Sequence, residues 1–424
     1  MSGVRDSVVC WVLVNCSFYH IARWSAFSDL SMAKSYVLEL SSNDIGMKEL
    51  TADIKTRFHR RSIYGHVMPA KVSQLNLFRK VFTSLDEISP SIVFVNGWAH
   101  TISIASMLWA VANKKRIVLF TESNRHDFQR SFFKELIKRI YLKSIDAAVC
   151  GGRLSEEYLV SLGMNKVRIF PGYNVVDNSH FDLYRKNKSQ LRPAWISEIV
   201  GQSRYFLSVG RLEAKKNHHT LIRAFSIFKT NCLESYDVKL IIAGAGELMA
   251  DLKNLIVLEK LEKDVFLIGG VNYERLPELY SNSFCFVHPS STEQWGLVVN
   301  EAMASALPVL VSDRCGCVPE LVHSGVNGFA FDSSDVKDIS GILCRFSNLT
   351  AVEIERFGKK SRRIIDDYSP VKFADGCVNA SVSALSCRNK SKFFTFYNRI
   401  IGSILSGFFG VFFFVYGLFY NESR

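Results

Sequence analysis

Short apolar runs alternate with amphipathic segments along the first half of the chain. The runs have the length and composition of buried strands, and they lie at Val8–Val14, Tyr36–Leu40, Ile92–Val95, Arg116–Phe120, Ala147–Val149 and Val167–Ile169. Between them, apolar residues recur at helical spacing over Ile21–Leu30, Leu75–Ile88, Ile102–Ala112, Ser131–Ser144 and Ser155–Leu162. This alternation predicts a parallel sheet covered by helices on both faces.

The same alternation returns in the second half. Strands are expected at Tyr205–Val209, Val238–Ala243, Val265–Ile268, Phe284–His288 and Pro308–Val311, with helices at His218–Thr230, Leu248–Glu259, Leu276–Ser281 and Gly296–Ala306. Periodicity is weak over 182–199, a charged stretch that contains Pro193, so we place a linker there. The pattern predicts an α/β protein of two Rossmann-like, doubly wound domains at 1–185 and 200–387, facing a cleft that holds the ligand.

Composition excludes a disordered chain and leaves the choice of partner open. Of 424 residues, 48% are apolar and only 9 are Pro, so large cores can form. The net charge of +12 comes from the first half and the tail: residues 1–200 carry 27 basic and 17 acidic side chains. Such a surface attracts nucleic acid, lipid headgroups or a phosphorylated substrate. No nucleic-acid-binding motif accompanies it, so we expect no nucleic acid partner.

The 10 cysteines are scattered and show no metal-binding spacing of the CxxC type. Reduced, buried thiols are therefore expected. The apolar run at Val8–Val14 is too short for the core of a signal peptide, so export is not expected.

A single stretch, Ile400–Tyr420, is long and apolar enough to cross a bilayer as a helix. Lys390, Lys392 and Arg399 precede it, which predicts a C-terminal anchor in region 388–424 with the preceding chain on the cytoplasmic side. The alternative is a buried last helix of the globular fold. Small residues four apart in this stretch also suggest a homodimer formed by close helix packing in lipid.

Candidate chemistry is concentrated in two loops of the second half. The first strand there is followed by Gly-Arg-Leu-Glu-Ala-Lys-Lys-Asn, in which Arg211 and Lys216 could neutralise a diphosphate leaving group. Taken alone, these two residues are more typical of a solvated surface loop, since loops rich in Lys are common. Gly244, in Gly-Ala-Gly after another strand, is interpreted as a tight turn near a nucleotide base, because the third glycine of a dinucleotide site is missing.

The second loop follows strand 284–288 and carries Glu293, then Gly296 at the start of a helix. Glycine allows close backbone approach, and the free N–H groups of a helix start, here at Leu297 and Val298, form an anion site. Glu301 lies eight residues after Glu293 in an otherwise apolar helix and is expected to point back toward the loop. A carboxylate near a helix start can also be a simple cap, which is the alternative for Glu293.

These motifs together resemble glycosyltransferase family 4, retaining enzymes of the GT-B architecture, and in particular a bacterial-type subset. The resemblance rests on VGRLEAKKNHHTLIRAF, KLIIAGAGEL, FCFVHPSSTEQWGLVVNEAMASALPVLVSD and GCVPELVHSGVNGFAF, which cover about residues 205–335 densely. The first half matches more loosely, through segments such as CSFYHIARWSAF and ESNRHDFQR.

The resemblance implies a nucleotide-diphospho-sugar donor held by the second domain and a glycan or lipid-linked acceptor held by the first. By position, Arg211 and Lys216 would bind the diphosphate, with Lys215 as an alternative, Glu293 the sugar hydroxyls and Glu301 the ribose. It further implies that backbone amides at Gly296, Leu297 and Val298 face the phosphate and sugar, and that no metal or other cofactor is needed.

Three features of the first half stay open at this stage. His126 matches a position where this family often has a histidine at the sugar site, but a structural loop histidine fits equally well. Asn96 and Trp98 could contact an acceptor or shape a turn. The helix over 130–143 carries basic residues that fit either a solvated face or a membrane surface.

The expected activity is transfer of a sugar in cell-surface glycan, polysaccharide or glycolipid synthesis. A nucleotide-sugar epimerase of the same fold and a non-catalytic, membrane-associated binding protein are the alternatives.

Overall fold

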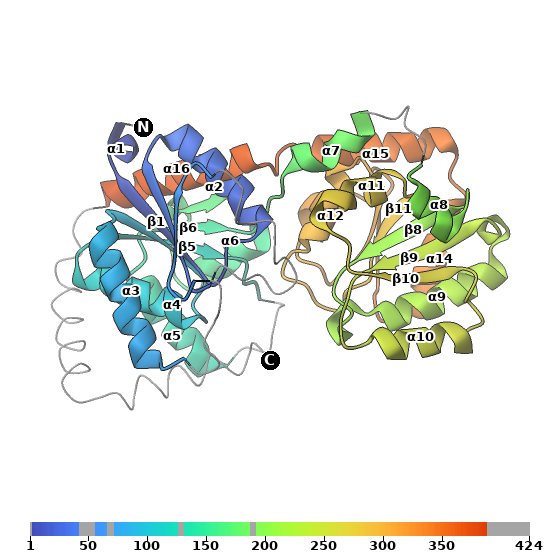
Figure 1. Ribbon diagram of the computed structural model, residues 1–424, viewed down its shortest axis with the longest axis horizontal. Helices are drawn as coiled ribbons and strands as arrows, with labels where there is room; N and C mark the ends of the chain where they lie inside the picture. The colour runs from blue at the N-terminus through green and yellow to red at the C-terminus, as the bar shows by residue number, and fades with distance from the viewer. Residues whose placement is uncertain (1, 42–55, 66–71, 126–130, 187–191, 388–424) are drawn as a thin grey trace. The chain divides into compact units, whose positions relative to one another are not determined.

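The computed structural model describes residues 2–41, 56–65, 72–125, 131–186 and 192–387. The chain divides into two compact units (Figure 1). Unit 1 contains residues 1–174 together with 370–424, and unit 2 contains residues 175–369.

Unit 1 is built on a seven-stranded sheet whose strands are all parallel, in the order β3-β2-β1-β4-β5-β6-β7. The strands are β1 (Val8–Leu13), β2 (Lys34–Glu39), β3 (His59–Ser62), β4 (Ile92–Asn96), β5 (Arg116–Thr121), β6 (Ala147–Cys150) and β7 (Ile169–Pro171). Five of them confirm the predicted apolar runs. The strand predicted at Val167–Ile169 is displaced, because Lys166–Arg168 forms the turn η1 and β7 begins only at Ile169. The missed strand, β3, has the sequence HRRS and pairs only with β2 at the edge of the sheet, so it carries no apolar run.

Helices cover both faces of this sheet, as the alternating pattern predicts. They are α1 (Ser2–Arg5), α2 (Phe18–Ser31), α3 (Gln74–Ile88), α4 (Thr101–Ala112), α5 (Phe132–Leu142), α6 (Arg153–Ser161), the turn η1 (Lys166–Arg168) and α16 (Pro370–Ser386). Side chains of α3, α4 and α6 share one hydrophobic cluster with the strands. On the other face, the Trp11 ring packs against Trp24 and Phe27 of α2 and against Phe373 of α16.

Helix α16 corrects the predicted domain boundary, which assigned residues up to 387 to the second domain. It lies on unit 1, beside α2, and its colour in Figure 1 marks it as the most C-terminal of the described elements. The close packing needs Gly376, since a Cβ there would lie 2.2 Å from the carbonyl oxygen of Pro171. Sequence periodicity reports that a helix is amphipathic, and it does not report which sheet receives its apolar face.

Unit 2 contains a six-stranded parallel sheet in the order β10-β9-β8-β11-β12-β13. The strands are β8 (Arg204–Val209), β9 (Val238–Ala243), β10 (Val265–Gly269), β11 (Cys285–His288), β12 (Val309–Ser312) and β13 (Gly328–Phe331). The helices and turns are α7 (Asn178–Lys186), α8 (Ala194–Val200), η2 (Ala214–Lys216), α9 (His218–Asn231), η3 (Leu233–Ser235), α10 (Met249–Leu258), η4 (Tyr273–Arg275), α11 (Leu276–Ser281), α12 (Leu297–Ala304), α13 (Val318–Leu321), α14 (Val336–Ser347) and α15 (Ala351–Ile365). The five predicted strands are confirmed, and β13 adds a sixth.

The predicted linker over 182–199 is wrong, because this stretch is part of unit 2. Helix α7 packs against α11 and α12, and α8 buries Ile196 completely. Glu278 of α11 ties both helices down, since one of its oxygens accepts a hydrogen bond from the Tyr184 hydroxyl and the other from the Trp195 indole, each at 2.6 Å. The charged residues of this stretch suggested a linker, but the two helices also carry apolar residues that are buried within unit 2.

The expectation of reduced thiols also needs one correction. Cys232, after α9, and Cys344, in α14, form a disulfide. Seven of the remaining eight cysteines are buried, as expected.

Two predictions about whole-chain architecture stay predictions. The apolar C-terminal helix at 400–420 and its basic flank lie outside the described residues. Within the described part of the chain, no helix is both long and apolar enough to span a bilayer. The predicted cleft between the two domains is not tested.

Candidate functional site

The loop between β8 and α9 carries the predicted cations of unit 2. Leu212 anchors it: its side chain is fully buried, and its N–H donates to the carbonyl of Ala245, in the loop after β9, at 3.0 Å. The single turn η2 follows and ends at Asn217, whose φ of 56° turns the chain into α9. The loop is thus held at the carboxyl edge of the sheet, where parallel α/β sheets bind ligands.

Asn217 joins this loop to two others. Its side-chain amide donates to the carbonyl of Pro289 at 3.2 Å and to the carbonyl of Ser333 at 2.8 Å. A second tie runs from the Ser291 N–H to the carbonyl of Lys215 at 2.9 Å. The loops after β8 and β11 are therefore positioned as one body.

Gly244 has a structural role that the sequence interpretation did not foresee. A Cβ at this position would lie 1.8 Å from the carbonyl oxygen of Gly210, an impossible contact, so only glycine lets the loops after β8 and β9 touch. The predicted role of Gly244 near a nucleotide base stays a prediction.

Glu293 lies at the centre of the site, on the loop between β11 and α12. Its backbone is fixed to the loop after β12, because its N–H donates to the carbonyl of Arg314 and the Gly316 N–H donates to its own carbonyl at 3.0 Å. Its carboxylate forms an ion pair with the Lys216 ammonium. The two side chains are 17% and 14% exposed, so the pair is largely shielded and still reachable from solvent.

The electrostatics of Glu293 follow from these neighbours. Burial raises the pKa of its carboxyl group, but the His288 ring beside it and the charge of Lys216 outweigh burial and bring the pKa down to about 2. Glu293 is therefore a carboxylate at all physiological pH values. It can accept hydrogen bonds from hydroxyl groups, and it cannot serve as an acid.

His288, the last residue of β11, lies behind this carboxylate and was not predicted as a site residue. Its Nε2 is 3.7 Å from Oε2 of Glu293, and the side chain is 2% exposed. Burial lowers the pKa of His288, so the ring is neutral. Buried His218, at the start of α9, interacts electrostatically with His288. Burial brings the pKa of His218 down to about 3. The only sequence signal for His288 is its place at a strand end, which many core histidines share.

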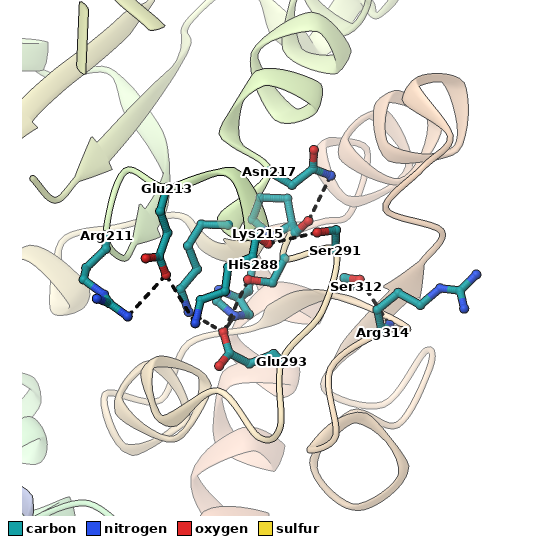
Figure 2. A network of polar contacts seen from close by, with 12 residues as sticks. Arg211, Glu213, Lys215, Asn217, His288, Ser291, Glu293, Ser312 and Arg314 are labelled. Carbon is teal, nitrogen blue, oxygen red and sulfur yellow. Dashed lines mark hydrogen bonds and ion pairs between the residues drawn. The ribbon is translucent and has the colours of Figure 1, made fainter. Parts of the chain in front are cut away.

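Arg211 does not contact the Lys216–Glu293 pair. Its guanidinium lies 3.3 Å from Oε1 of Glu213, and the Lys215 ammonium lies at the same distance from that oxygen (Figure 2). The Arg211 side chain is 73% exposed, so it is available to a ligand. Glu213, a partner of both cations, was not predicted, since an acidic residue in a charged loop is unremarkable in sequence.

Gly296 begins helix α12 with φ 100°, a conformation that favours glycine. A Cβ there would lie 3.4 Å from Nε2 of His288 and 3.5 Å from Cγ of Glu293, so the missing side chain also keeps the site open. Leu297 and Val298 are the first residues of α12, where backbone N–H groups lack helical partners. The predicted amide edge therefore lies next to Glu293.

Glu301 is buried within unit 2, with 1% of its surface exposed. One oxygen of its carboxylate accepts a hydrogen bond of 2.7 Å from the hydroxyl of Tyr280, itself fully buried in α11. Its predicted contact with a ribose stays a prediction.

In unit 1, the sequence candidates are partly explained by packing. Trp98 is buried, with its ring edge-on to Tyr141 and Tyr158, so it is a core residue. The Asn96 side chain accepts a hydrogen bond from the Tyr173 hydroxyl at 3.1 Å. His126 lies outside the described residues. Within the described ranges, no group of three or more His, Cys, Asp or Glu side chains is arranged to hold a metal ion.

Comparison with known proteins assigns a family description to this site. Residues 192–363, which include every residue of the Lys216–Glu293 network, match the family model described as Glycosyl transferases group 1. The segment that matches this family model lies within unit 2.

Similar proteins extend the likeness beyond this segment. An uncharacterized glycosyltransferase of Methanocaldococcus jannaschii is 32% identical over 39% of this chain and 40% of its own length. The GPI3 subunit of the Saccharomyces cerevisiae phosphatidylinositol N-acetylglucosaminyltransferase is 24% identical over 77% of this chain and 70% of its own length. The chain thus spans less than half of the first relative and about two thirds of the second.

Solved structures share the whole fold. The Anabaena HepE protein, determined in complex with UDP and glucose, covers 89% of this chain and all of its own, with a TM-score of 0.68 and 16% identity. The solved structures show the fold alone, while the family match and the curated relatives support the prediction of a glycosyltransferase over the epimerase and the non-catalytic binding protein.

Proposed function

We propose that the chain is a retaining glycosyltransferase of the family 4 type, which transfers a sugar from a nucleotide-diphospho-sugar to an acceptor without a metal ion. The observation that carries this proposal is the Lys216–Glu293 pair, held by joined loops at the carboxyl edge of the unit 2 sheet. A cation for a diphosphate and a carboxylate for sugar hydroxyls are the two groups that such a donor needs side by side.

The reaction breaks the bond between the anomeric carbon and the diphosphate oxygen, and the electron pair leaves with the diphosphate. The acceptor hydroxyl oxygen forms the new bond to the same carbon, and its proton passes to the departing diphosphate. Negative charge therefore develops on the leaving group, where Arg211, Lys216 and the first amides of α12 can stabilise it.

Donor binding requires a change of partners within the site. Lys216 neutralises Glu293 in the ligand-free structure, and the diphosphate competes for the same ammonium. When Lys216 turns to the phosphate, the Glu293 carboxylate is released for the sugar hydroxyls. The Ser290 hydroxyl, which donates to that carboxylate at 3.4 Å, then remains as a partner on the protein side.

The acceptor is proposed to be a glycan or a lipid-linked sugar bound by unit 1, with His126 at the sugar site. A lipid acceptor is supported by the name of the yeast relative and by the apolar segment 400–420, through which the enzyme would be anchored from the cytoplasmic side and could form a homodimer.

The decisive experiment is a thermal-shift screen of the full-length protein with UDP-, GDP- and dTDP-sugars. We expect one nucleotide class to raise Tm, because a ligand that binds only the folded state stabilises it by mass action. The shift should be lost in Lys216→Ala and Glu293→Gln and retained in Lys253→Ala, an exposed lysine on α10. Equal shifts in all three variants, or no shift with any donor, would exclude this donor site.

Metal independence has its own test. We expect donor binding and sugar transfer to proceed unchanged in EDTA, since Arg211 and Lys216 supply the positive charge. Activity that disappears in EDTA and returns with Mg²⁺ or Mn²⁺ would show that a metal holds the diphosphate.

A further inference from the structure

Helix α5 of unit 1 presents a broad apolar face to solvent. Its exposed fractions are 77% for Phe132, 68% for Phe133, 45% for Leu136 and 46% for Ile140. At 100° per residue these four positions fall within one sector of the helix. Large apolar side chains gathered in this way mark an interaction surface, whereas a single exposed Leu or Phe does not.

Positive charge lies within the same sector. Arg139 and Lys143 are exposed, and their positions on the helix fall between or beside those of the apolar residues. The Arg139 guanidinium donates to the carbonyl of Ser161 at 3.1 Å, which holds it at the surface beside α6.

The helix's one carboxylate is turned away from this face. Glu135 accepts a hydrogen bond of 2.6 Å from the Tyr158 hydroxyl and one of 3.3 Å from the Lys138 ammonium. Lys138 is itself buried, with its ammonium 5.5 Å from the centres of the Trp98 and Tyr158 rings. The negative charge is thus neutralised on the inner side, and the outer side is apolar and cationic.

We propose that this α5 face, consisting of Phe132, Phe133, Leu136, Arg139, Ile140 and Lys143, docks unit 1 onto an anionic lipid bilayer. A helix that combines aromatic and aliphatic side chains with interleaved cations lies in the plane of the interface, with its apolar side chains among the acyl chains and its cations at anionic headgroups. Unit 1 also belongs to the basic half of the chain, which strengthens the attraction.

This surface does not depend on the proposed sugar transfer or on the segment 400–420. It would hold unit 1 against the bilayer, where a lipid-linked acceptor would be found. Failure of the lipid experiment would leave the donor screen unaffected, and failure of the donor screen would leave the lipid surface in place.

The test is quenching of an introduced tryptophan in the full-length protein, measured as the difference from the parent, whose own 6 tryptophans give the background. Phe133→Trp places a reporter on the α5 face, and Leu233→Trp places a matched reporter on unit 2, at a leucine that is 98% exposed. Both variants are added to phosphatidylcholine vesicles, with or without phosphatidylglycerol, that carry brominated acyl chains. Because both retain residues 400–424, any anchoring by the tail is common to the two.

We expect bromine to quench the Phe133→Trp reporter, and to leave the Leu233→Trp reporter unchanged, when phosphatidylglycerol is present. Adding Phe132→Ser to the first reporter should weaken vesicle binding of this face by ~10-fold, since a large apolar group no longer enters the bilayer. Arg139→Gln with Lys143→Gln should remove the dependence on phosphatidylglycerol.

Equal quenching of the two reporters would overturn the proposal. It would also be overturned if the Phe133→Trp emission moved to shorter wavelength with protein concentration alone, without quenching by brominated lipid. That result would assign the face to a second copy of the chain.

Discussion

The pairing of Lys216 with Glu293 is expected to make the proposed donor site sensitive to the loss of a single charge. Lys216→Ala and Arg211→Ala are each expected to lower kcat by ~100-fold or more, because charge on the leaving diphosphate loses its stabilisation. Steady-state kinetics with the donor found in the screen measure this, and Lys253→Ala is the control. Turnover at the parent rate in both variants would contradict the role given to these cations.

Glu301 is expected to act on donor binding. Glu301→Gln keeps the side-chain volume and removes the charge, so Kd for the donor should rise while the fold is retained. Isothermal titration with the donor, compared with the free sugar phosphate, would separate a nucleotide contact from a sugar contact. An unchanged Kd would confine Glu301 to its hydrogen bond with Tyr280.

Buried His218 predicts how stability changes with pH. Its pKa is about 3 in the folded protein and about 6.5 when unfolded, so between these values the unfolded state binds a proton that the folded state does not. Stability is therefore fully present above pH 6.5 and falls as the pH drops, by about 1.4 kcal/mol per pH unit from this group. The free energy of unfolding, measured with urea at a series of pH values in this range, should change less steeply with pH in His218→Gln than in the parent. An equally steep dependence on pH in both proteins would mean that His218 is protonated in the folded protein.

Among single residues, the sequence predicts site candidates that are marked by their own place in the chain. It does not predict residues whose role depends on contacts with distant segments. Arg211, Lys216 and Glu293 could be predicted because each lies in a loop that follows a strand. Glu213 and His288 could not, since an ion-pair partner is chosen by packing among three loops that are remote in sequence.

At the scale of elements, the loops after β8 and β9 lie so close together that residue 244 has to be glycine. Gly244→Ala would drive a methyl group into the Gly210 carbonyl, so it should destabilise unit 2 by about 3 kcal/mol or force the cation loop away from Glu293. Gly270→Ala is the matched control, since a Cβ there meets nothing within 4 Å. Chemical denaturation together with donor Kd would register either effect, and two variants of equal stability and affinity would argue against the contact.

The strands were predictable because parallel strands buried on both faces are continuous apolar runs. Strand β3 was not predicted because its sequence, HRRS, contains no apolar run. Helices α7 and α8 were not predicted because their apolar residues are few and are separated by charged residues. The periodicity of apolar residues shows that one side of a helix is buried. It does not show which sheet that side packs against, which is why α16 was assigned to the wrong unit.

For the whole molecule, the position of α16 separates two truncations. Ending the chain after Arg388 keeps α16, so the protein should retain donor binding. It should leave the membrane fraction on washing with high salt, because only the charge-dependent α5 face would still hold it there. Ending it after Ser369 removes the helix that covers Trp11 and Phe120, so unit 1 should become sensitive to protease while the donor site of unit 2 is kept. Limited proteolysis and donor thermal shifts measure both, and a protease-resistant unit 1 in the shorter protein would contradict the role of α16.

The return of the chain to unit 1 also has a consequence for biosynthesis. The ribosome completes the seven strands of unit 1 first, then all of unit 2, and only afterwards releases the helix that covers the Trp11 face of the first sheet. While the 195 residues from Val175 to Ser369 are translated, that face is not yet covered by α16. Unit 2, which is continuous in sequence, can fold in that interval, so the unit with the proposed donor site is expected to mature before the unit that begins the chain.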